Sequence, residues 1–406
     1  MPVVDLPALG LDQSSITAAR ERLASVIRPT TAERSHSLTK RFGRDVWLKG
    51  EHRQRTGSFK IRGAYVMQST LGPGASVVAG SAGNHAQGVA LAAAMLGQRA
   101  TIHMPTGASL PKVQATRAYG AEVILGGDTV DDCIASAREQ AGETGAVFVP
   151  PFDHPAVVRG QATIGLELLD EVPGLANVLV AIGGGGLCGG IAAAIKGARP
   201  DVRVIGVVAQ GAAAMLRSIE RGAPVTVQPA TLADGIAVGA PSQLTLELVA
   251  AHTDAVVAVA DGNISQAMLL LVERAKAVVE PAGAAPLAAL LDDVELEPGP
   301  VAVVLGGGNV DPMLLAKLVD HGLSVAGRYL AVRVVMDDRP GSLARLTARL
   351  AEMRLNVLDV EHHRWGRHLP VGAVELELTV ETRDIGHQME VLAQLREHGF
   401  DIHPVD

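Results

Sequence analysis

Lys60 is the side chain of this sequence best suited to covalent chemistry. It lies in the segment GSFKIRGA, residues 57–64, where small and hydroxyl-bearing residues surround a single amine next to Phe59. The chain has seven lysines against twenty-eight arginines, so lysine is not its general source of positive surface charge. Partial desolvation lowers the pKa of a lysine and frees its amine to form a Schiff base with a carbonyl compound. A solvated lysine at the start of a helix is the alternative, and this segment alone leaves both open.

Two other loops have compositions that suit anion binding. The sequence SAGNHAQGVA, residues 81–90, follows an aliphatic run and would begin a helix, where free backbone N–H groups hold anions. Asn84 adds a side-chain amide for a phenolic or carboxylate oxygen. The sequence GGGGL, residues 183–187, places four glycines after another aliphatic run. Four glycines are costly in a simple turn, but they would let a phosphate approach successive amides closely.

A third loop, LGGGNVD at residues 305–311, would bring backbone close to a flat ligand, although it could also be an ordinary helix cap. The four-glycine loop has neither a dinucleotide fingerprint nor the GK[ST] of nucleotide-binding loops, so a phosphate monoester fits it better. An imine-forming lysine, a phosphate site and an amide for a ring oxygen together match pyridoxal phosphate. The sequence therefore predicts pyridoxal 5'-phosphate as the cofactor.

Six ordered motifs resemble the threonine dehydratases (threonine ammonia-lyases), which are pyridoxal-phosphate enzymes of the tryptophan-synthase-β-like family. They are QRTGSFKIRGA (54–64), SAGNHAQGVA, GGGGL, ADGIAV (233–238), EPAGA (280–284) and GGGNVD (306–311), and the resemblance covers roughly residues 10–325. DRPG (338–341) and NVLDVEHHR (356–364) resemble the single ACT domain of the shorter, ACT-bearing members. The resemblance implies an α/β fold of type II, with two lobes of parallel or mixed sheets and flanking helices in residues 1–326. An ACT-like regulatory domain would follow in residues 327–406.

The resemblance implies a role for each matching position. Lys60 would be the catalytic Schiff-base lysine, and Phe59 would pack near the cofactor ring. The other cofactor-binding positions would be Asn84 at the ring hydroxyl, Gly235 close to the ring, Gly306 at the pyridine nitrogen, and Gly183, Gly184, Gly185, Gly186 and Leu187 around the phosphate. The substrate carboxylate would be received by Ser81, Ala82, Gly83, Asn84 and His85.

Three positions depart from the patterns of the family and its relatives. Gly306 stands where a serine, threonine or cysteine usually meets the ring nitrogen, so the ring would be a weaker electron sink that still permits β-elimination. Ala82 stands where related serine racemases carry the serine that acts on the opposite face, which argues against racemisation. Val208 stands where some relatives carry a metal-binding glutamate, so we expect no metal there.

Two further features are weighed against ordinary structural explanations. His362, His363 and His368 alternate faces on a predicted strand and turn, without a cysteine or acid to complete a metal-binding set. We interpret these histidines as structural or interface residues. Glu280 would either approach the cofactor ring or a monovalent cation, or serve as the acid at a helix end, and the sequence leaves both open.

Alternating strands and helices must position these loops. Short aliphatic runs predict buried parallel strands at residues 77–79, 100–104, 122–125, 178–182, 202–208 and 301–305. Helical patterns fall between them at residues 86–96, 131–143, 157–171, 187–196 and 264–278. This alternation predicts an α/β domain with helices on both faces of its sheets.

The pattern changes near residue 326. Strands are predicted at residues 330–336, 356–362, 371–381 and 401–404, with helices at 342–353 and 385–398. The order βαββαβ is typical of a ferredoxin-like domain. Gly341 and Asn356 mark where such domains often hold an amino acid at a paired interface, so we expect an amino-acid effector there. A module that serves only dimerisation is the alternative.

Composition excludes several classes of partner. The net charge of −8 argues against nucleic acid or an anionic membrane. No apolar run approaches the roughly 18 residues of a membrane span, and the first residues lack the pattern of a signal peptide. Two cysteines supply neither a disulfide framework nor a structural zinc site. We therefore expect a cytoplasmic protein. We also expect it to be a homodimer or homotetramer. With 48% hydrophobic but only 2% aromatic residues, its core should be aliphatic.

The predicted function is the dehydration and deamination of the small amino acid L-threonine to 2-oxobutanoate and ammonia. The resemblance places this β-elimination in amino-acid metabolism, such as isoleucine biosynthesis, under allosteric control, with L-serine a further substrate that would give pyruvate. One alternative is a dehydratase for serine or another 3-hydroxy amino acid. A second is an amino-acid sensor whose catalytic domain has decayed, which only Gly306 favours.

Overall fold

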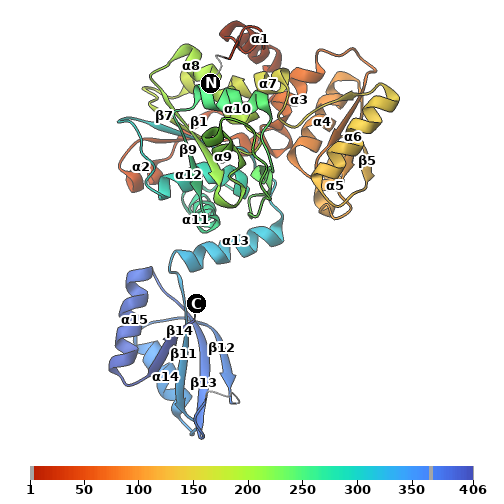
Figure 1. The fold of residues 1–406 in the computed structure, drawn as a ribbon. Helices are drawn as coiled ribbons and strands as arrows, with labels where there is room; N and C mark the ends of the chain where they lie inside the picture. The colour runs from red at the N-terminus through yellow and green to blue at the C-terminus, as the bar shows by residue number, and fades with distance from the viewer. Residues whose placement is uncertain (1–3, 365–368, 406) are drawn as a thin grey trace. The chain divides into compact units, whose positions relative to one another are not determined.

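The computed structural model describes residues 4–364 and 369–405 as two compact units, Met1–Ala316 and Lys317–Asp406 (Figure 1). The division between the units falls within helix α13 (Pro312–Val325). The predicted domain boundary at residues 326 and 327 follows the end of this helix and stays a prediction.

A four-stranded parallel sheet forms the smaller lobe of the first unit. Its strands lie in the order β5-β4-β3-β6. They are β3 (Ser76–Gly80), β4 (Arg99–Met104), β5 (Glu122–Leu125) and β6 (Val147–Phe148). Three helices pack around this sheet in Figure 1, α4 (Asn84–Leu96), α5 (Leu110–Ala118) and α6 (Val130–Thr144). Parallel strands need such cover on both faces, which explains the buried aliphatic residues Val77, Val78 and Ala79 within β3.

A six-stranded mixed sheet forms the larger lobe, in the order β1-β2-β10-β7-β8-β9. Only β1 (Ala32–Arg34) is antiparallel to its neighbour, β2 (Val46–Lys49). The others are β7 (Asn177–Ala181), β8 (Arg203–Ala209), β9 (Ala255–Val259) and β10 (Val301–Val304). Every residue of β7 and β10 is buried, as expected for central strands.

The remaining helices of the first unit cover this sheet or join the lobes. They are α1 (Gln13–Leu23), α2 (His36–Phe42), α3 (Lys60–Gln68), α7 (Pro155–Glu171), α8 (Gly186–Ala198), α9 (Ala214–Arg221), α10 (Gln243–His252), α11 (Asp261–Leu270) and α12 (Pro281–Leu291). Short helical turns lie at Glu51–Arg53, Arg55–Gly57, Gln210–Ala212 and Asp234–Ile236. Helix α3 contacts both α4 of the small lobe and α7. It therefore ties the two lobes together.

The second unit is a βαββαβ domain with an antiparallel sheet in the order β12-β13-β11-β14. Strand β11 (Tyr329–Asp337) pairs along its whole length with β13 (Ala373–Glu381), and β12 (Val357–His363) and β14 (Asp401–Pro404) lie at the edges. Alternate residues of β11 and β13 share one buried core with helices α14 (Ser342–Glu352) and α15 (Ile385–Glu397). Both helices thus cover one face of the sheet, and the predicted fold class is confirmed.

Two predicted elements are wrong in detail. Strand β5 forms where expected but is not buried, because it is the edge of the small sheet and leaves Glu122, Ile124 and Leu125 exposed. The helix predicted for residues 264–278 ends early. After α11 a π-helical turn covers Leu271–Ala275, and Lys276 then adopts a left-handed conformation with a φ of 55°. A left-handed residue ends a helix, so the chain is extended before Glu280.

Candidate functional site

Lys60 is the first residue of α3 and follows a segment fixed against the loop after β10. Ser58 forms an isolated bridge with Gly307, and the Phe59 amide donates to the Gly306 carbonyl at 3.1 Å. Thr56 and Gly57 both have positive φ angles, 64° and 71°, which turn the chain sharply before this contact. The strained turn therefore places Lys60 at the carboxyl end of the large sheet.

The Lys60 amine lies in an environment that favours its neutral form. Its Nζ donates to the carbonyl oxygen of Pro151 at 2.8 Å and lies 5.3 Å from the centroid of the Phe59 ring. Burial lowers the pKa of Lys60 to about 8, although negative charge on Glu280 opposes this shift. Reactive lysines are activated in this way, which favours the covalent interpretation of this residue over a solvated charge.

A buried ionic cluster anchors α3 from its other side. The Arg62 guanidinium is inaccessible to solvent and pairs with Glu51 at 2.8 Å and with Glu167 at 2.6 Å. Lys49 also pairs with Glu167, at 2.7 Å. Burial would raise the pKa of Glu167, but the charges of Arg62 and Lys49 outweigh it and lower that pKa to about 2. The cluster thus remains ionised and fixes the helix that carries Lys60.

The loop after β3 leads directly into α4. The Ser81 amide donates to the His103 carbonyl at 3.0 Å, and the Gly83 amide donates to the Ser81 hydroxyl at 3.2 Å. Asn84 and His85 supply the first amides of α4. The His85 Nε2 lies 2.8 Å from the Val149 carbonyl, and burial together with the Lys60 charge lowers the pKa of His85 to about 3. His85 is therefore a neutral imidazole that donates to this carbonyl.

The four glycines after β7 are explained by packing against protein. A Cβ on Gly184 would overlap the ring of Phe152, and one on Gly186 would lie 2.9 Å from the Phe152 carbonyl. Gly185 has a φ of 93°, and its Cβ would lie 2.6 Å from Met215. Packing against protein thus requires glycine at these positions, and the sequence argument that side chains here would also block a ligand stays a prediction.

The amides of this loop are nevertheless free to bind an anion. Helix α8 begins at Gly186, and its first amides have no partner within the helix. Within residues 4–364 and 369–405, no backbone or side-chain acceptor takes the amides of Gly183, Gly184 or Gly185. Successive free amides at a helix start attract an anion.

One cavity of about 1020 Å³ brings these groups together. It contains every residue predicted to act in catalysis or to bind cofactor or substrate, namely Phe59, Lys60, Ser81, Ala82, Gly83, Asn84, His85, Gly183, Gly184, Gly185, Gly186, Leu187, Gly235 and Gly306. Pyridoxal phosphate fits this set, because a neutralised lysine, a free-amide anion site and the Asn84 amide line the same space. Their roles toward it stay predictions.

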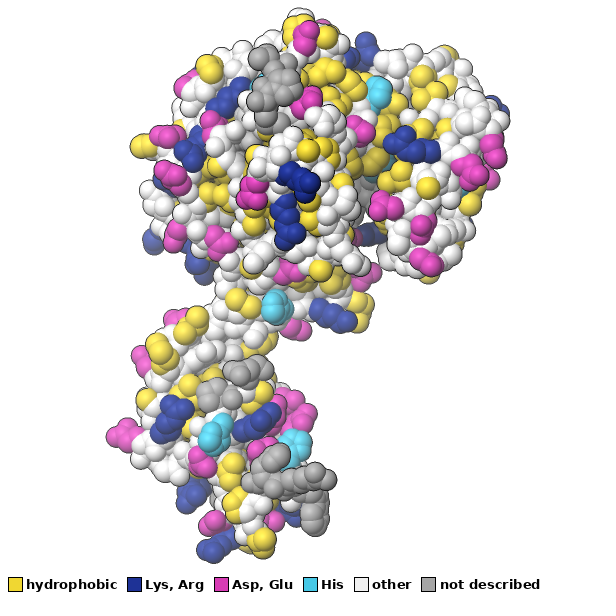
Figure 2. Space-filling view, in the orientation of Figure 1, with side chains coloured by type: hydrophobic (Ala, Val, Ile, Leu, Met, Phe, Trp, Pro, Cys, Tyr) yellow, Lys and Arg dark blue, Asp and Glu magenta, His cyan; other side chains and the backbone are white. Residues whose placement is uncertain are grey.

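The cavity also contains residues that the sequence did not single out. Lys112 pairs with Asp234 at 2.9 Å, and its ammonium lies close to Gly83. Basic and acidic side chains are interspersed over the face shown in Figure 2, so a carboxylate would depend on such local charge. Glu280, which the sequence left open, is buried and accepts a hydrogen bond from Asn84 at 2.7 Å. The scarcity of lysine could have drawn attention to Lys112.

The two predicted effector residues lie in the second unit. Gly341 has a φ of 93° and precedes α14, and an added Cβ there would meet open space. The Asn356 carbonyl accepts from the Glu381 amide at 2.9 Å. These backbone features suit a sharp turn and a strand end, and the effector site stays a prediction.

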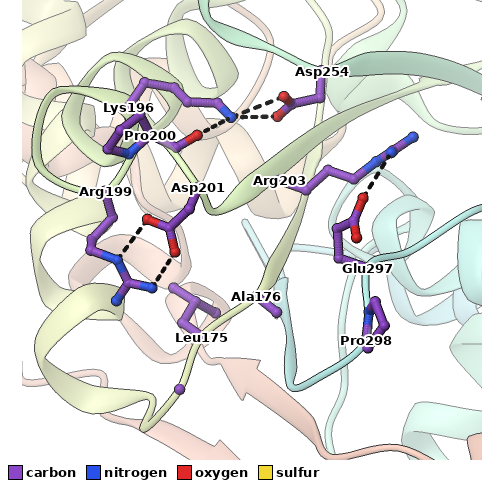
Figure 3. A pocket seen from close by; sticks show the side chains of 11 residues that line it. Leu175, Ala176, Lys196, Arg199, Pro200, Asp201, Arg203, Asp254, Glu297 and Pro298 are labelled. Atoms are coloured by element: carbon purple, nitrogen blue, oxygen red, sulfur yellow. Dashed lines mark hydrogen bonds and ion pairs between the residues drawn. The ribbon is translucent and has the colours of Figure 1, made fainter.

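A second, smaller pocket of about 360 Å³ contains none of the predicted residues (Figure 3). Its basic side chains are paired with acids, Lys196 with Asp254, Arg199 with Asp201 and Arg203 with Glu297. Charges balanced in this way explain its polar surface without a ligand.

In the part of the chain that the structure describes, no group of three or more histidine, cysteine or acidic side chains is arranged to hold a metal ion. His368, one of the three histidines considered from the sequence, lies outside the described residues. No helix within the described ranges is long and apolar enough to cross a membrane.

Comparison with known proteins gives matches along most of the chain. Residues 23–307 match the family model described as pyridoxal-phosphate dependent enzyme, and residues 331–397 match the ACT domain. The L-threonine ammonia-lyase of Geobacter sulfurreducens is 44% identical over 398 residues, which are 96% of this chain and 98% of that protein. The L-threonine ammonia-lyase of Thermotoga maritima is 43% identical, covering 95% and 98%. A crystal structure of threonine deaminase from T.th. is 39% identical with a TM-score of 0.71, covering 74% of this chain and 99% of that one.

Proposed function

Because the chain belongs to the pyridoxal-phosphate-dependent enzymes and carries an ACT domain, we propose that it converts L-threonine to 2-oxobutanoate and ammonia. Relatives of nearly the same length that are named L-threonine ammonia-lyase support this substrate. The structural observation that carries the proposal is the Lys60 amine, which lies in the same cavity as the free amides before α8. An amine and an anion site in one space are what an aldehyde phosphate requires.

Lys60 would hold the cofactor through its amine and would also move a proton. With its pKa lowered to about 8, a useful fraction of this amine is unprotonated near neutral pH and can attack an aldehyde. As a free amine, Lys60 would take the Cα proton of the bound substrate as general base. The Pro151 carbonyl, which accepts from Nζ at 2.8 Å, keeps the free amine inside the cavity. The bound cofactor supplies a conjugated ring that withdraws electrons from the substrate Cα.

Backbone amides provide the binding contacts. Those of Gly183–Gly186 hold the phosphate, since the start of α8 favours negative charge. The amides that begin α4 at Asn84 and His85 receive the substrate carboxylate, and the Lys112 ammonium beside Gly83 adds positive potential. The Asn84 side chain donates to the ring hydroxyl.

Two small residues direct the reaction toward elimination. Ala82 lines the cavity but offers no acid or base, so a proton removed by Lys60 cannot be returned by this residue from the other face. Gly306 also lines the cavity and presents no hydrogen-bonding side chain. Loss of the β-hydroxyl as water, followed by hydrolysis of the enamine, then yields the 2-oxo acid and ammonia.

L-Serine is a second candidate substrate, because it has the same leaving group and lacks only a methyl group. One methyl in an apolar site changes kcat/KM by only about 10- to 200-fold. Comparison of kcat/KM for threonine and serine decides between a threonine enzyme and a more general 3-hydroxy-amino-acid dehydratase. The sensor alternative loses support because Lys60 and the glycine loop lie together in one cavity.

The ACT domain supports binding of an amino-acid effector, for which Gly341 and Asn356 are the proposed contacts. A paired assembly, as a homodimer or homotetramer, belongs to the same proposal. The expected cytoplasmic location stays a prediction.

The test is production of 2-oxobutanoate from threonine by the full chain loaded with pyridoxal phosphate, with and without branched-chain amino acids. We expect turnover in the wild type and in Lys40→Ala, which changes an exposed lysine, and none in Lys60→Ala. A Lys60→Ala protein that turned over threonine at the wild-type rate would contradict the catalytic role proposed for Lys60.

A further inference from the structure

The Asn84 side chain is held at both ends by other side chains. Its Nδ2 donates to Glu280 Oε1 at 2.7 Å, and its Oδ1 accepts from Asn309 Nδ2 at 2.8 Å. The same Asn309 nitrogen donates to the Thr56 carbonyl at 2.7 Å. These bonds form a continuous relay from a backbone carbonyl through two amides to a carboxyl group.

The relay has a defined direction. A backbone carbonyl can only accept a hydrogen bond. The side chain of Asn309 must therefore turn its nitrogen, which has two hydrogens to donate, toward the Thr56 carbonyl. The same Asn309 nitrogen also faces the Asn84 side chain. Because this nitrogen is a donor, the Asn84 side chain must present its oxygen to it. The Asn84 nitrogen is thereby turned toward Glu280. Reversal of either amide would set oxygen against oxygen.

The fold makes room for this relay with two glycines. A Cβ on Gly57 would overlap the Asn309 oxygen, and Gly57 also has a φ of 71°. A Cβ on Gly307 would overlap the Glu280 carboxyl and lie 3.0 Å from Asn84 Nδ2. Both glycines are therefore required by the side chains of the relay.

The two ends of the relay differ in their access to the cavity. Asn84 and Glu280 line it, whereas Asn309 does not. The nitrogen end of Asn84 thus faces a cavity-lining group, and its oxygen end faces a residue that does not line the cavity. We infer that Asn309 is a positioning residue, which acts through Asn84 by keeping that amide's nitrogen available to an acceptor in the cavity. This inference rests on the proposed function, since the acceptor is the ring hydroxyl of the cofactor.

Glu280 completes the relay as an acceptor whatever its charge. Burial is the main cause, and the negative charge of Asp234 the second cause, of the rise in the pKa of Glu280 to about 7. The hydrogen bond from Asn84 and the positive charges of Lys112 and Lys60 act in the opposite direction and only partly offset this rise. Its carbonyl oxygen accepts in the protonated acid, and both oxygens accept in the carboxylate. Glu280 accepts a hydrogen bond from one N–H of the Asn84 amide. The second N–H of that amide can therefore donate to a group in the cavity.

A double-mutant cycle tests the relay, with the dissociation constant of pyridoxal phosphate measured by titrating the cofactor-free full chain. Asn84→Ala removes the hydrogen bond to the ring hydroxyl and leaves that group without its partner in the cavity, which should raise Kd about 10- to 100-fold. Asn309→Ala should raise Kd about 5- to 10-fold in the wild type, because Asn84 is then free to turn. In the Asn84→Ala background, Asn309→Ala should change Kd less than about twofold, because the residue it positions is gone.

Two further variants separate positioning from loss of structure. Asn309→Asp places acceptors against both the Thr56 carbonyl and the Asn84 oxygen, so it should raise Kd more than Asn309→Ala does. Asn177→Ala removes a buried asparagine that bonds residue 297 at the other end of the sheet. It should lower the thermal midpoint and leave Kd unchanged.

Each outcome is decisive. If the increases in Kd caused by Asn84→Ala and Asn309→Ala simply multiply in the double variant, the two residues act independently. That result would overturn the relay and leave the proposed function unaffected. A wild-type chain that takes up no cofactor would overturn both. If Asn309→Ala does not fold, Asn309→Asp in the two backgrounds gives the same cycle.

Discussion

Gly306 and Gly307 are adjacent glycines for which the structure predicts opposite responses to alanine. A Cβ on Gly306 would lie 3.4 Å from the Phe59 ring and 3.8 Å from Leu187, which is ordinary contact. A Cβ on Gly307 would overlap Glu280 Oε1, with 2.8 Å to the Cδ of that carboxyl. Glu280 cannot move aside freely, because it is buried and accepts the Asn84 bond.

The size of the difference follows from overpacking. An extra carbon forced into a closely packed site costs about 1–3 kcal/mol. If this cost falls on the geometry that binds the cofactor, the Kd of Gly307→Ala rises about 5- to 150-fold. Gly306→Ala should stay within about threefold of the wild type and form the same absorbing complex.

The assay is titration of each cofactor-free variant with pyridoxal phosphate, followed by the absorbance of the lysine-linked cofactor. Thermal midpoints of the cofactor-free proteins serve as a control for folding. The reasoning is refuted if Gly307→Ala binds as the wild type does, or if Gly306→Ala is the more damaged of the two.

Three further predictions concern groups around the cavity. Arg62→Met leaves the buried Glu51 carboxylate without its ion pair and Glu167 paired with Lys49 but not with Arg62, and it should reduce the free energy of unfolding by about 3–5 kcal/mol in urea titrations. Arg20→Met, at an exposed pair, should cost less than about 1 kcal/mol. Lys112→Met should raise KM for threonine about 2- to 5-fold with little change in kcat, and equal KM values for this variant and Lys40→Met would contradict it. The rate at which the cofactor-free protein forms an imine with the aldehyde of pyridoxal phosphate should rise as pH increases through about 8, because only the neutral Lys60 amine attacks. A rate that does not depend on pH between about 6 and 9 would contradict this.

Local patterns predicted most of the helices and strands, because short aliphatic runs and alanine-rich helices can be recognised from residues that are close together in the sequence. The run at residues 122–125 shows the limit of such patterns. It forms strand β5, but its exposure depends on its place at the edge of the sheet, which is a property of the assembled lobe. The end of α11 was missed because the π-helical turn before Lys276 carries no glycine or proline to mark it.

The candidate site was predicted by its motifs, while the contacts between motifs were not. Lys60, Asn84 and the glycine loop were found because each has an unusual composition for its position. The bond from Asn309 to Asn84 joins residues 225 positions apart, and the pair of Lys112 with Asp234 joins residues 122 apart. No single-sequence pattern links such residues. The first pair forms where the start of α4 meets the loop after β10, and the second forms where α5 meets the helical turn Asp234–Ile236.

The central claim is that one lysine, Lys60, carries the cofactor. The most direct measurement is reduction of the loaded full chain with borohydride, which fixes the cofactor to its lysine, followed by digestion and mass spectrometry of the peptides. The account predicts that the added mass lies on the peptide containing Lys60 and on none of the other six lysines. Cofactor mass on another lysine, or none on any peptide of a catalytically active protein, would contradict it.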